Sequence, residues 1–239
     1  MSIDRRAAVF AALLSVLALG FAALGVWQIE RLQWKLRLIA TVNARVTQAP
    51  EPAPGPADWP QVSFDHDAYR RIRIDGRYLN DKAVLVQALT EQGAGFWVLT
   101  PLQTDRQFVV IVNRGFVPTD RSDPATLQKI AVTGPVAVTG LLRLSEPHGR
   151  FLEANQPAQN LWYSRDVEAL AEHERLGVHA PYFIDAEAAA DANALPVGGL
   201  TVIHFANSHL IYVLTWFGLC GLSLFGVFWV LRGDRGREA

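Results

Sequence analysis

The sequence has a single cysteine, Cys220, among its 239 residues. One cysteine excludes an intrachain disulfide framework and a thiolate metal cluster. The chain also has no G-x-S-x-G elbow, no P-loop, no G-x-G-x-x-G and no H-E-x-x-H. Its formal net charge of −1 provides no excess of positive charge for nucleic acid. We therefore expect a protein that is not an enzyme and does not bind nucleic acid.

Charged residues are missing from two long apolar stretches, residues 7–29 and 210–231. At about 1.5 Å rise per residue, each stretch would form a helix of roughly 33 Å, enough to cross a hydrocarbon core of about 30 Å. The alternatives are a signal peptide for the first stretch and a buried core helix for the second. However, the first stretch continues through Trp27 and Ile29 instead of ending at a small-residue cleavage site. The sequence therefore predicts two transmembrane helices, the first at residues 7–29.

The two short tails, residues 1–6 and 232–239, are rich in arginine: Arg5, Arg6, Arg232, Arg235 and Arg237. Under the positive-inside rule both tails lie in the cytoplasm, and the long connection between the helices lies on the opposite side. No Arg-rich and Ser-rich transit segment precedes the first stretch, which favours a bacterium. We expect a multi-pass protein of the bacterial inner membrane with its main domain in the periplasm.

The connection between the two membrane helices is expected to contain three parts. A juxtamembrane helix is expected at residues 30–46 and a proline-rich linker at 47–62, where the prolines should exclude both helix and strand pairing. Residues 63–205 are expected to form the folded domain. The second transmembrane helix would then occupy residues 206–231.

Polar and apolar residues alternate in RRIRIDGRYL (70–79), which indicates a strand. Strand-length runs bounded by turn signals follow: AVLVQAL (83–89), GFWVLTPLQT (95–104), QFVVIVNRGFVP (107–118), VAVTGLLRL (136–144) and HAPYFIDAE (179–187). Short helices are expected at 125–131 and 162–176. The predicted fold class is α+β: two transmembrane helices flank a β-rich periplasmic domain, which is an antiparallel meander or a small barrel with short helices.

Two histidines, His204 and His209, flank the start of the second membrane helix. An imidazole at membrane depth is costly and tends to face a partner or a cavity, and an interfacial histidine solvated by headgroups is the alternative. If the two helices pack as a hairpin, His209 lies at a depth similar to that of Trp27. Small residues would permit this packing: Ala7, Ala11, Ser15, Ala18 and Ala22 on the first helix, and Gly218 and Gly221 on the second.

Aromatic and cationic side chains gather at this level on both helices. A helical wheel places Trp27 and Arg31 on one face of the first helix. On the second helix His209, Tyr212 and Trp216 recur at i, i+3 and i+7. A planar, apolar and dianionic ligand such as haem would suit these faces, with His209 as the iron ligand and Arg31 near the propionates. The alternative is an ordinary interfacial belt of aromatic and basic residues.

Five segments of the chain, taken in order, carry a resemblance to a known family. They are GVWQIERLQWK (25–35), NRGFVP (113–118), NLWYSRD (160–166), YFID (182–185) and NSHLIYVLTWF (207–217). Together they resemble the surfeit-locus-one family of assembly factors for haem–copper cytochrome c oxidase. The resemblance covers nearly the whole chain and includes the arrangement of two membrane helices around an outer domain.

The resemblance implies an inner-membrane assembly factor without catalysis, which binds haem a transiently and assists its insertion into subunit I of the oxidase. Its partners would be subunit I and the lipid bilayer, with haem a synthase as a further candidate. It implies that His209 is the metal ligand and that Trp216 is a stacking or structural partner. The full candidate set for haem a is His209, Trp216, Trp27, Arg31 and Tyr212. A cofactor-free scaffold that stabilises a subunit I intermediate is the alternative function.

Overall fold

The computed structural model describes residues 5–149, 153–191, 194–203 and 207–235. It divides into two compact units. The first comprises Met1–Thr41 with His204–Ala239, and the second comprises Val42–Ile203. Of the residues singled out above, His204 and Arg237 lie outside the described part of the chain.

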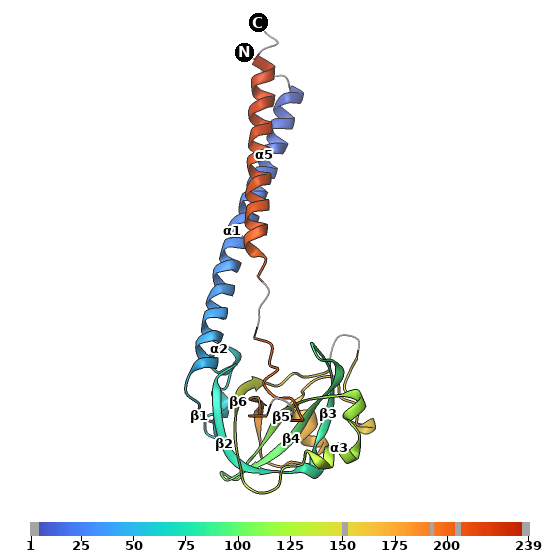
Figure 1. Ribbon diagram of the computed structural model, residues 1–239. Coiled ribbons are helices and arrows are strands. Elements are labelled where there is room, and N and C mark those ends of the chain that lie inside the picture. The colour runs from blue at the N-terminus through green and yellow to red at the C-terminus, as the bar shows by residue number, and fades with distance from the viewer. Residues whose placement is uncertain (1–4, 150–152, 192–193, 204–206, 236–239) are drawn as a thin grey trace. The chain divides into compact units, whose positions relative to one another are not determined.

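The first unit is built from α5 (His209–Arg235) and from α1 (Arg5–Thr47) up to Thr41, two long helices that lie side by side in Figure 1. By length and composition both are long and apolar enough to cross a membrane. Only 17% of the most apolar window of α1 and 11% of that of α5 is buried. The core helix of a soluble protein would be mostly buried, so the alternative of a core helix at residues 210–231 is wrong.

The second unit contains a small closed β-barrel (Figure 1). Its main strands are β2 (Arg71–Tyr78), β3 (Val84–Thr90), β4 (Gly93–Thr104), β5 (Val109–Pro118), β6 (Val136–Leu144) and β7 (His179–Ala186). All six predicted strands are confirmed. The sheet runs β2-β6-β7-β5-β4, and β4 pairs back onto β2 to close the barrel. Of the two predicted topologies the small barrel is correct. A purely antiparallel meander is excluded because β5 and β7 run parallel.

The apolar residues of the strands are buried in two clusters. One contains Ile72, Leu102, Val112 and Tyr182, contributed by four strands of the barrel. The other contains the strand residues of opposite parity, such as Val86, Ile111 and Phe183, together with residues of helix α4 (Val167–His173). Successive side chains of a strand point to opposite faces, so β4, β5 and β7 supply both clusters, whereas β2 and β6 supply only the first and β3 only the second. Burial of both faces stabilises the closed barrel.

The helices of this unit are shorter than predicted. Helix α3 (Pro124–Lys129) confirms the helix expected at 125–131. The helix expected at 162–176 begins only at Val167, because Asp166 caps it and accepts a hydrogen bond from the backbone N of Ala169. Trp162 instead forms a β-bridge with Val86 and is fully buried. Short helices complete the unit: α2 (Phe64–Asp67), η1 (Trp59–Gln61), η2 (Asn80–Lys82), η3 (Thr119–Arg121) and η4 (Pro157–Gln159).

The proline-rich segment is part of the folded unit. Strand β1 (Glu51–Pro52) pairs in parallel with β2, so the prediction that prolines exclude strand pairing is wrong here. β1 lies at the edge of the sheet, where a residue without an N–H is tolerated. The next residue, Ala53, is buried, and Pro54 O accepts a hydrogen bond of 2.7 Å from the Tyr182 hydroxyl.

Candidate functional site

Small residues on α1 face α5 at intervals of seven. Ala11, Ala18 and Gly25 are all buried within the helix pair. A Cβ added at Gly25 would lie 2.8 Å from the Phe217 ring. Such a repeat is typical of helices that cross at a shallow angle and approach closely. The expected close packing of the two helices is therefore present, with Ala11 and Ala18 among the predicted residues.

On α5 the residues that permit this approach differ from those predicted. Added Cβ atoms at Gly218 and Gly221 would meet nothing within 4 Å, so these glycines do not face α1. At Gly226 an added Cβ would lie 3.0 Å from Leu14, and Ser223 is buried. His209, Trp216 and Ser223 stand seven residues apart and thus share the face of α5 that packs against α1.

The polar contact between the helices joins Gln28 to His209. The Gln28 Oε1 atom lies 2.7 Å from Nδ1 of the His209 ring, and Gln28 is only 8% exposed. The His209 backbone N donates to Asn207 Oδ1 at 3.3 Å, which places the histidine in the first turn of α5. In the part of the chain that the structure describes, the second ring nitrogen, Nε2, has no hydrogen-bond partner. A neutral imidazole with one nitrogen engaged and the other open can act as a metal ligand.

Trp216 is the second polar group on this face. Its ring stacks on Phe21, with centroids 5.8 Å apart and planes inclined by 26°. Its Nε1 is buried and has no acceptor among the described residues. A buried N–H without an acceptor costs about 1–3 kcal/mol, so the unit holds an unsatisfied donor two turns from His209.

The remaining candidates lie outside this contact. Trp27 and Tyr212 are each 50% exposed, and Arg31 is exposed and lies over the Trp34 ring, with Cζ 4.7 Å from the ring centroid. Among the described residues, no hydrogen bond or ring contact joins these three to His209. The structure therefore brings His209 and Trp216 onto one face and leaves Trp27, Arg31 and Tyr212 on other faces of their helices.

Sequence reasoning missed Gln28. Its signal was present, since it is the one amide side chain within the uncharged stretch 7–29. A polar residue in an apolar membrane-length helix tends to face another helix, where it can hydrogen-bond. The helical wheel instead gave weight to the aromatic and cationic residues next to it.

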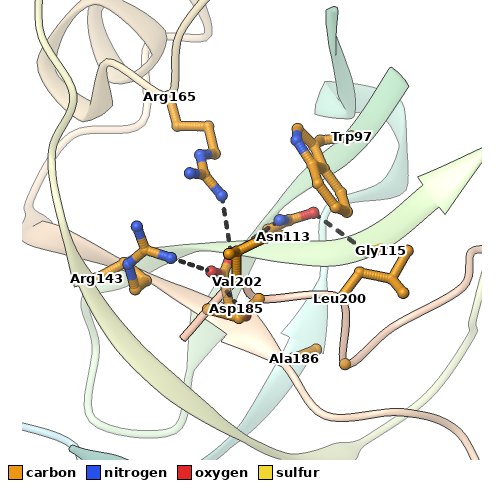
Figure 2. A pocket seen from close by; sticks show the side chains of 11 residues that line it. Trp97, Asn113, Gly115, Arg143, Arg165, Asp185, Ala186, Leu200 and Val202 are labelled. Carbon is orange, nitrogen blue, oxygen red and sulfur yellow. Dashed lines mark hydrogen bonds and ion pairs between the residues drawn. The ribbon is translucent and has the colours of Figure 1, made fainter. Parts of the chain in front are cut away.

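A second polar cluster lies in the barrel and centres on Asp185 (Figure 2). The Asp185 side chain is 4% exposed and accepts hydrogen bonds from four side chains. The donors are Asn113 Nδ2 at 2.8 Å, Arg143 Nη1 at 2.9 Å, Thr201 Oγ1 at 3.0 Å and Arg165 Nη1 at 3.3 Å. These residues border a cavity of about 130 Å³, together with Trp97.

Both arginines of this cluster are neutralised within the barrel. Arg165 also donates to both carboxylate oxygens of Glu146, at 2.9 and 2.6 Å, and stacks on Phe183 at 4.9 Å. Burial would lower the pKa of Arg165, but the charges of Asp185 and Glu146 and the hydrogen bonds with Glu146 outweigh it and raise the pKa. The guanidinium therefore stays charged, and the cluster is a saturated framework that ties β5, β6, β7 and the segment around Thr201 together.

The SURF1 family model matches residues 15–221. The chain belongs to the SURF1 family. Surfeit locus protein 1 of Mus musculus is 36% identical over 216 residues, which cover 84% of this chain and 68% of the mouse protein. Surfeit locus protein 1 of Homo sapiens is 36% identical over 82% of this chain and 69% of its own length. A SURF1-like protein of Monosiga brevicollis is 35% identical over 94% of this chain and 87% of its own length.

Membership of the SURF1 family confirms the resemblance drawn from five sequence segments, and the structure gathers these segments into two sites. GVWQIERLQWK provides Gln28 and NSHLIYVLTWF provides His209, which meet in the helix pair. NRGFVP, NLWYSRD and YFID provide Asn113, Arg165 and Asp185, which meet in the barrel. Within NRGFVP, Pro118 ends β5, and Gly115 has φ +130° with the backbone of Val197 2.4 Å from an added Cβ. The role of Gly115 is thus structural.

Proposed function

We propose that this protein is an assembly factor for cytochrome c oxidase that binds haem a at His209 and assists its insertion into subunit I. SURF1 family members are known as cytochrome oxidase assembly factors, which supports the general role. The observation that carries the haem proposal is the His209 ring, held by Gln28 at Nδ1 and open at Nε2. The protein needs no catalytic step for this role, because transfer of a cargo requires only binding and release.

The proposal places α1 and α5 across the bacterial inner membrane, with both termini in the cytoplasm and the barrel in the periplasm. Two apolar helices with outward-facing side chains support insertion. Arginines in the two tails support the orientation. Subunit I is then a partner in the same bilayer, and haem a synthase is a candidate donor of the cargo.

The residues around His209 fit haem a as a cargo. A neutral His209 imidazole would hold the haem iron through Nε2. The unsatisfied Trp216 N–H on the same face supplies a donor that the helix pair itself does not use. Trp27, Arg31 and Tyr212 lie on other faces of their helices, so the haem proposal rests on His209 and Trp216.

The test is purification of the full-length protein after co-expression with haem a synthesis. We expect a Soret band in wild type that is lost in His209→Ala and retained in His66→Ala, which removes an exposed histidine of the barrel unit. Loss of the band in both variants, or in neither, would contradict a ligand role for His209.

The same experiment separates the cofactor-free scaffold from the haem carrier. A colourless wild type that still restores oxidase activity in a deletion strain would support the scaffold. If the deletion strain has normal oxidase activity, both assembly roles are wrong.

A further inference from the structure

The hydrogen bond between Gln28 and His209 bears on which ring nitrogen can bind a metal. A neutral imidazole carries one proton, and the nitrogen that lacks it is the one with a free lone pair. The Gln28 Oε1 atom accepts hydrogen bonds and does not donate them, and it lies 2.7 Å from Nδ1. An acceptor at this distance places the proton on Nδ1 and leaves the lone pair on Nε2.

We propose that Gln28 is a positioning residue that holds His209 in the Nδ1–H tautomer and directs Nε2 as the haem ligand. This inference rests on the proposed function of His209. Histidines that ligate metals commonly donate their other N–H to an acceptor, which fixes the tautomer and the orientation of the ring. Gln28 occupies this place from the opposite helix, so the ligand is oriented only when α1 and α5 are packed.

The group that accepts the Nδ1–H hydrogen bond also affects how strongly Nε2 binds the haem iron. A carboxylate would draw the Nδ1 proton more strongly and give the ring more imidazolate character, which strengthens its bond to ferric iron. A neutral amide polarises the ring less. An amide therefore suits a carrier that must release its haem to the next protein, whereas a carboxylate suits permanent retention.

If the hydrogen bond between Gln28 and His209 served only to pack the two helices, it would not need to fix the tautomer of the ring. Side-chain hydrogen bonds between membrane helices hold the helices together, and a glutamine amide can serve either tautomer, because it offers both an acceptor and a donor. A purely structural contact thus requires no particular proton position on His209. The tautomer and the properties of the bound iron are therefore the readouts that separate positioning from helix packing.

The first experiment measures the tautomer without haem. Full-length protein labelled with ¹⁵N-histidine is reconstituted in detergent micelles at a pH where the ring is neutral, and the His209 signals are assigned by their loss in His209→Gln. We expect protonated Nδ1 and unprotonated Nε2 in wild type, the same tautomer in Gln28→Glu, and a shift toward the Nε2–H form in Gln28→Leu. An Nε2–H tautomer in wild type would overturn the inference.

The second experiment titrates the same proteins with haem a. We expect Gln28→Leu to weaken binding about 10–100-fold, as is typical for loss of an outer hydrogen-bond partner of a metal ligand. Gln28→Glu should retain binding, lower the reduction potential of the iron and slow the release of haem to excess apomyoglobin. The control is Gln33→Leu, which removes an exposed glutamine of the same helix and should change nothing.

The two proposals fail in different ways. If wild type binds no haem but Gln28→Leu still changes the tautomer, the proposed function is wrong and Gln28 does position the ring. If wild type binds haem through His209 but Gln28→Leu changes neither tautomer nor affinity, Gln28 is only a helix contact and the inference is wrong. A Gln28→Leu protein that fails to fold leaves the decision to Gln28→Glu, whose potential would be unchanged if Gln28 did not act through the ring.

Discussion

The two polar clusters of this protein differ in how completely their groups are satisfied. In the barrel, Asp185 accepts hydrogen bonds from four side chains, and Arg165 is shared between two carboxylates. In the helix pair, His209 has one side-chain partner and the buried Trp216 N–H has none among the described residues. Burial without a partner costs free energy, so a saturated cluster serves the fold. The helix pair instead holds a buried donor that the described residues leave unsatisfied.

Removal of Asp185 gives the largest expected effect. Asp185→Ala leaves Arg143 without its closest carboxylate and removes one of the two that neutralise Arg165. Loss of one member of a buried ion pair typically costs about 3–5 kcal/mol, because the other charge stays buried without compensation. Denaturant unfolding of the full-length protein, followed by tryptophan fluorescence, measures this loss.

The control for this prediction is Asp75→Ala, in which the removed carboxylate is 57% exposed and lies 3.6 Å from Arg73. Exposed pairs contribute at most about 1 kcal/mol, so this variant should stay close to wild type. Folded Asp185→Ala should still bind haem a at low temperature. Equal losses of stability in the two variants would show that the ion pairs of Asp185 contribute no more to the free energy of unfolding than an exposed ion pair.

The sequence was sufficient for the strands and for the two apolar helices, because these follow from local periodicity. β6 kept its predicted extent, residues 136–144, and β5 begins two residues later than predicted, at Val109. Closure of the barrel and the parallel pairing of β5 with β7 depend on contacts between distant segments, which no local pattern encodes. The prediction that Pro52 excludes strand pairing was wrong for a similar reason. A proline is tolerated in a strand at the edge of a sheet, and the position of a strand in the sheet depends on distant segments.

The candidate site was predicted in part for a different physical reason. His209 and Trp216 were found because histidine and tryptophan are unusual on one face of an apolar helix. Trp27 and Arg31 were expected beside them, although aromatic and basic residues at a membrane boundary are favoured on the outside of the helix. Small residues and the amide of Gln28 occupy the face toward α5, since close packing and hydrogen bonding decide which residues lie there.

The barrel should lose stability in alkali, where the Tyr78 hydroxyl ionises. Burial raises the pKa of Tyr78 from 10 to about 12, although the charge of Arg114 partly opposes this rise. The folded state therefore holds the phenolic proton more tightly than the unfolded chain. Its contribution to stability is fully present below pH 10 and is lost as the pH rises through about 12. This loss corresponds to roughly 2–3 kcal/mol.

Two measurements check this expectation. Ultraviolet titration of wild type and Tyr78→Phe should assign a phenolate that forms only near pH 12 to Tyr78, and denaturant unfolding at pH 9 and pH 11.5 should show the loss. In Tyr78→Phe the difference in unfolding free energy between these pH values should be smaller. If Tyr78 ionises near pH 10 in the folded protein, burial does not stabilise its neutral form.

Trp216→Phe should give the smallest change in stability and still alter haem binding. The substitution removes the buried N–H that lacks an acceptor, which favours the variant by about 1–3 kcal/mol, and leaves a smaller ring against Phe21, which costs a similar amount. The two effects offset, so the stability of the haem-free protein should change by less than about 1 kcal/mol. Haem a content after co-expression should nevertheless fall, because the donor is lost. Trp229→Phe, at an exposed position of the same helix, should change neither quantity. If Trp216→Phe were much less stable and its haem a content were unchanged, Trp216 would serve helix packing alone. Of the two polar groups on this face, only His209 would then contact haem a.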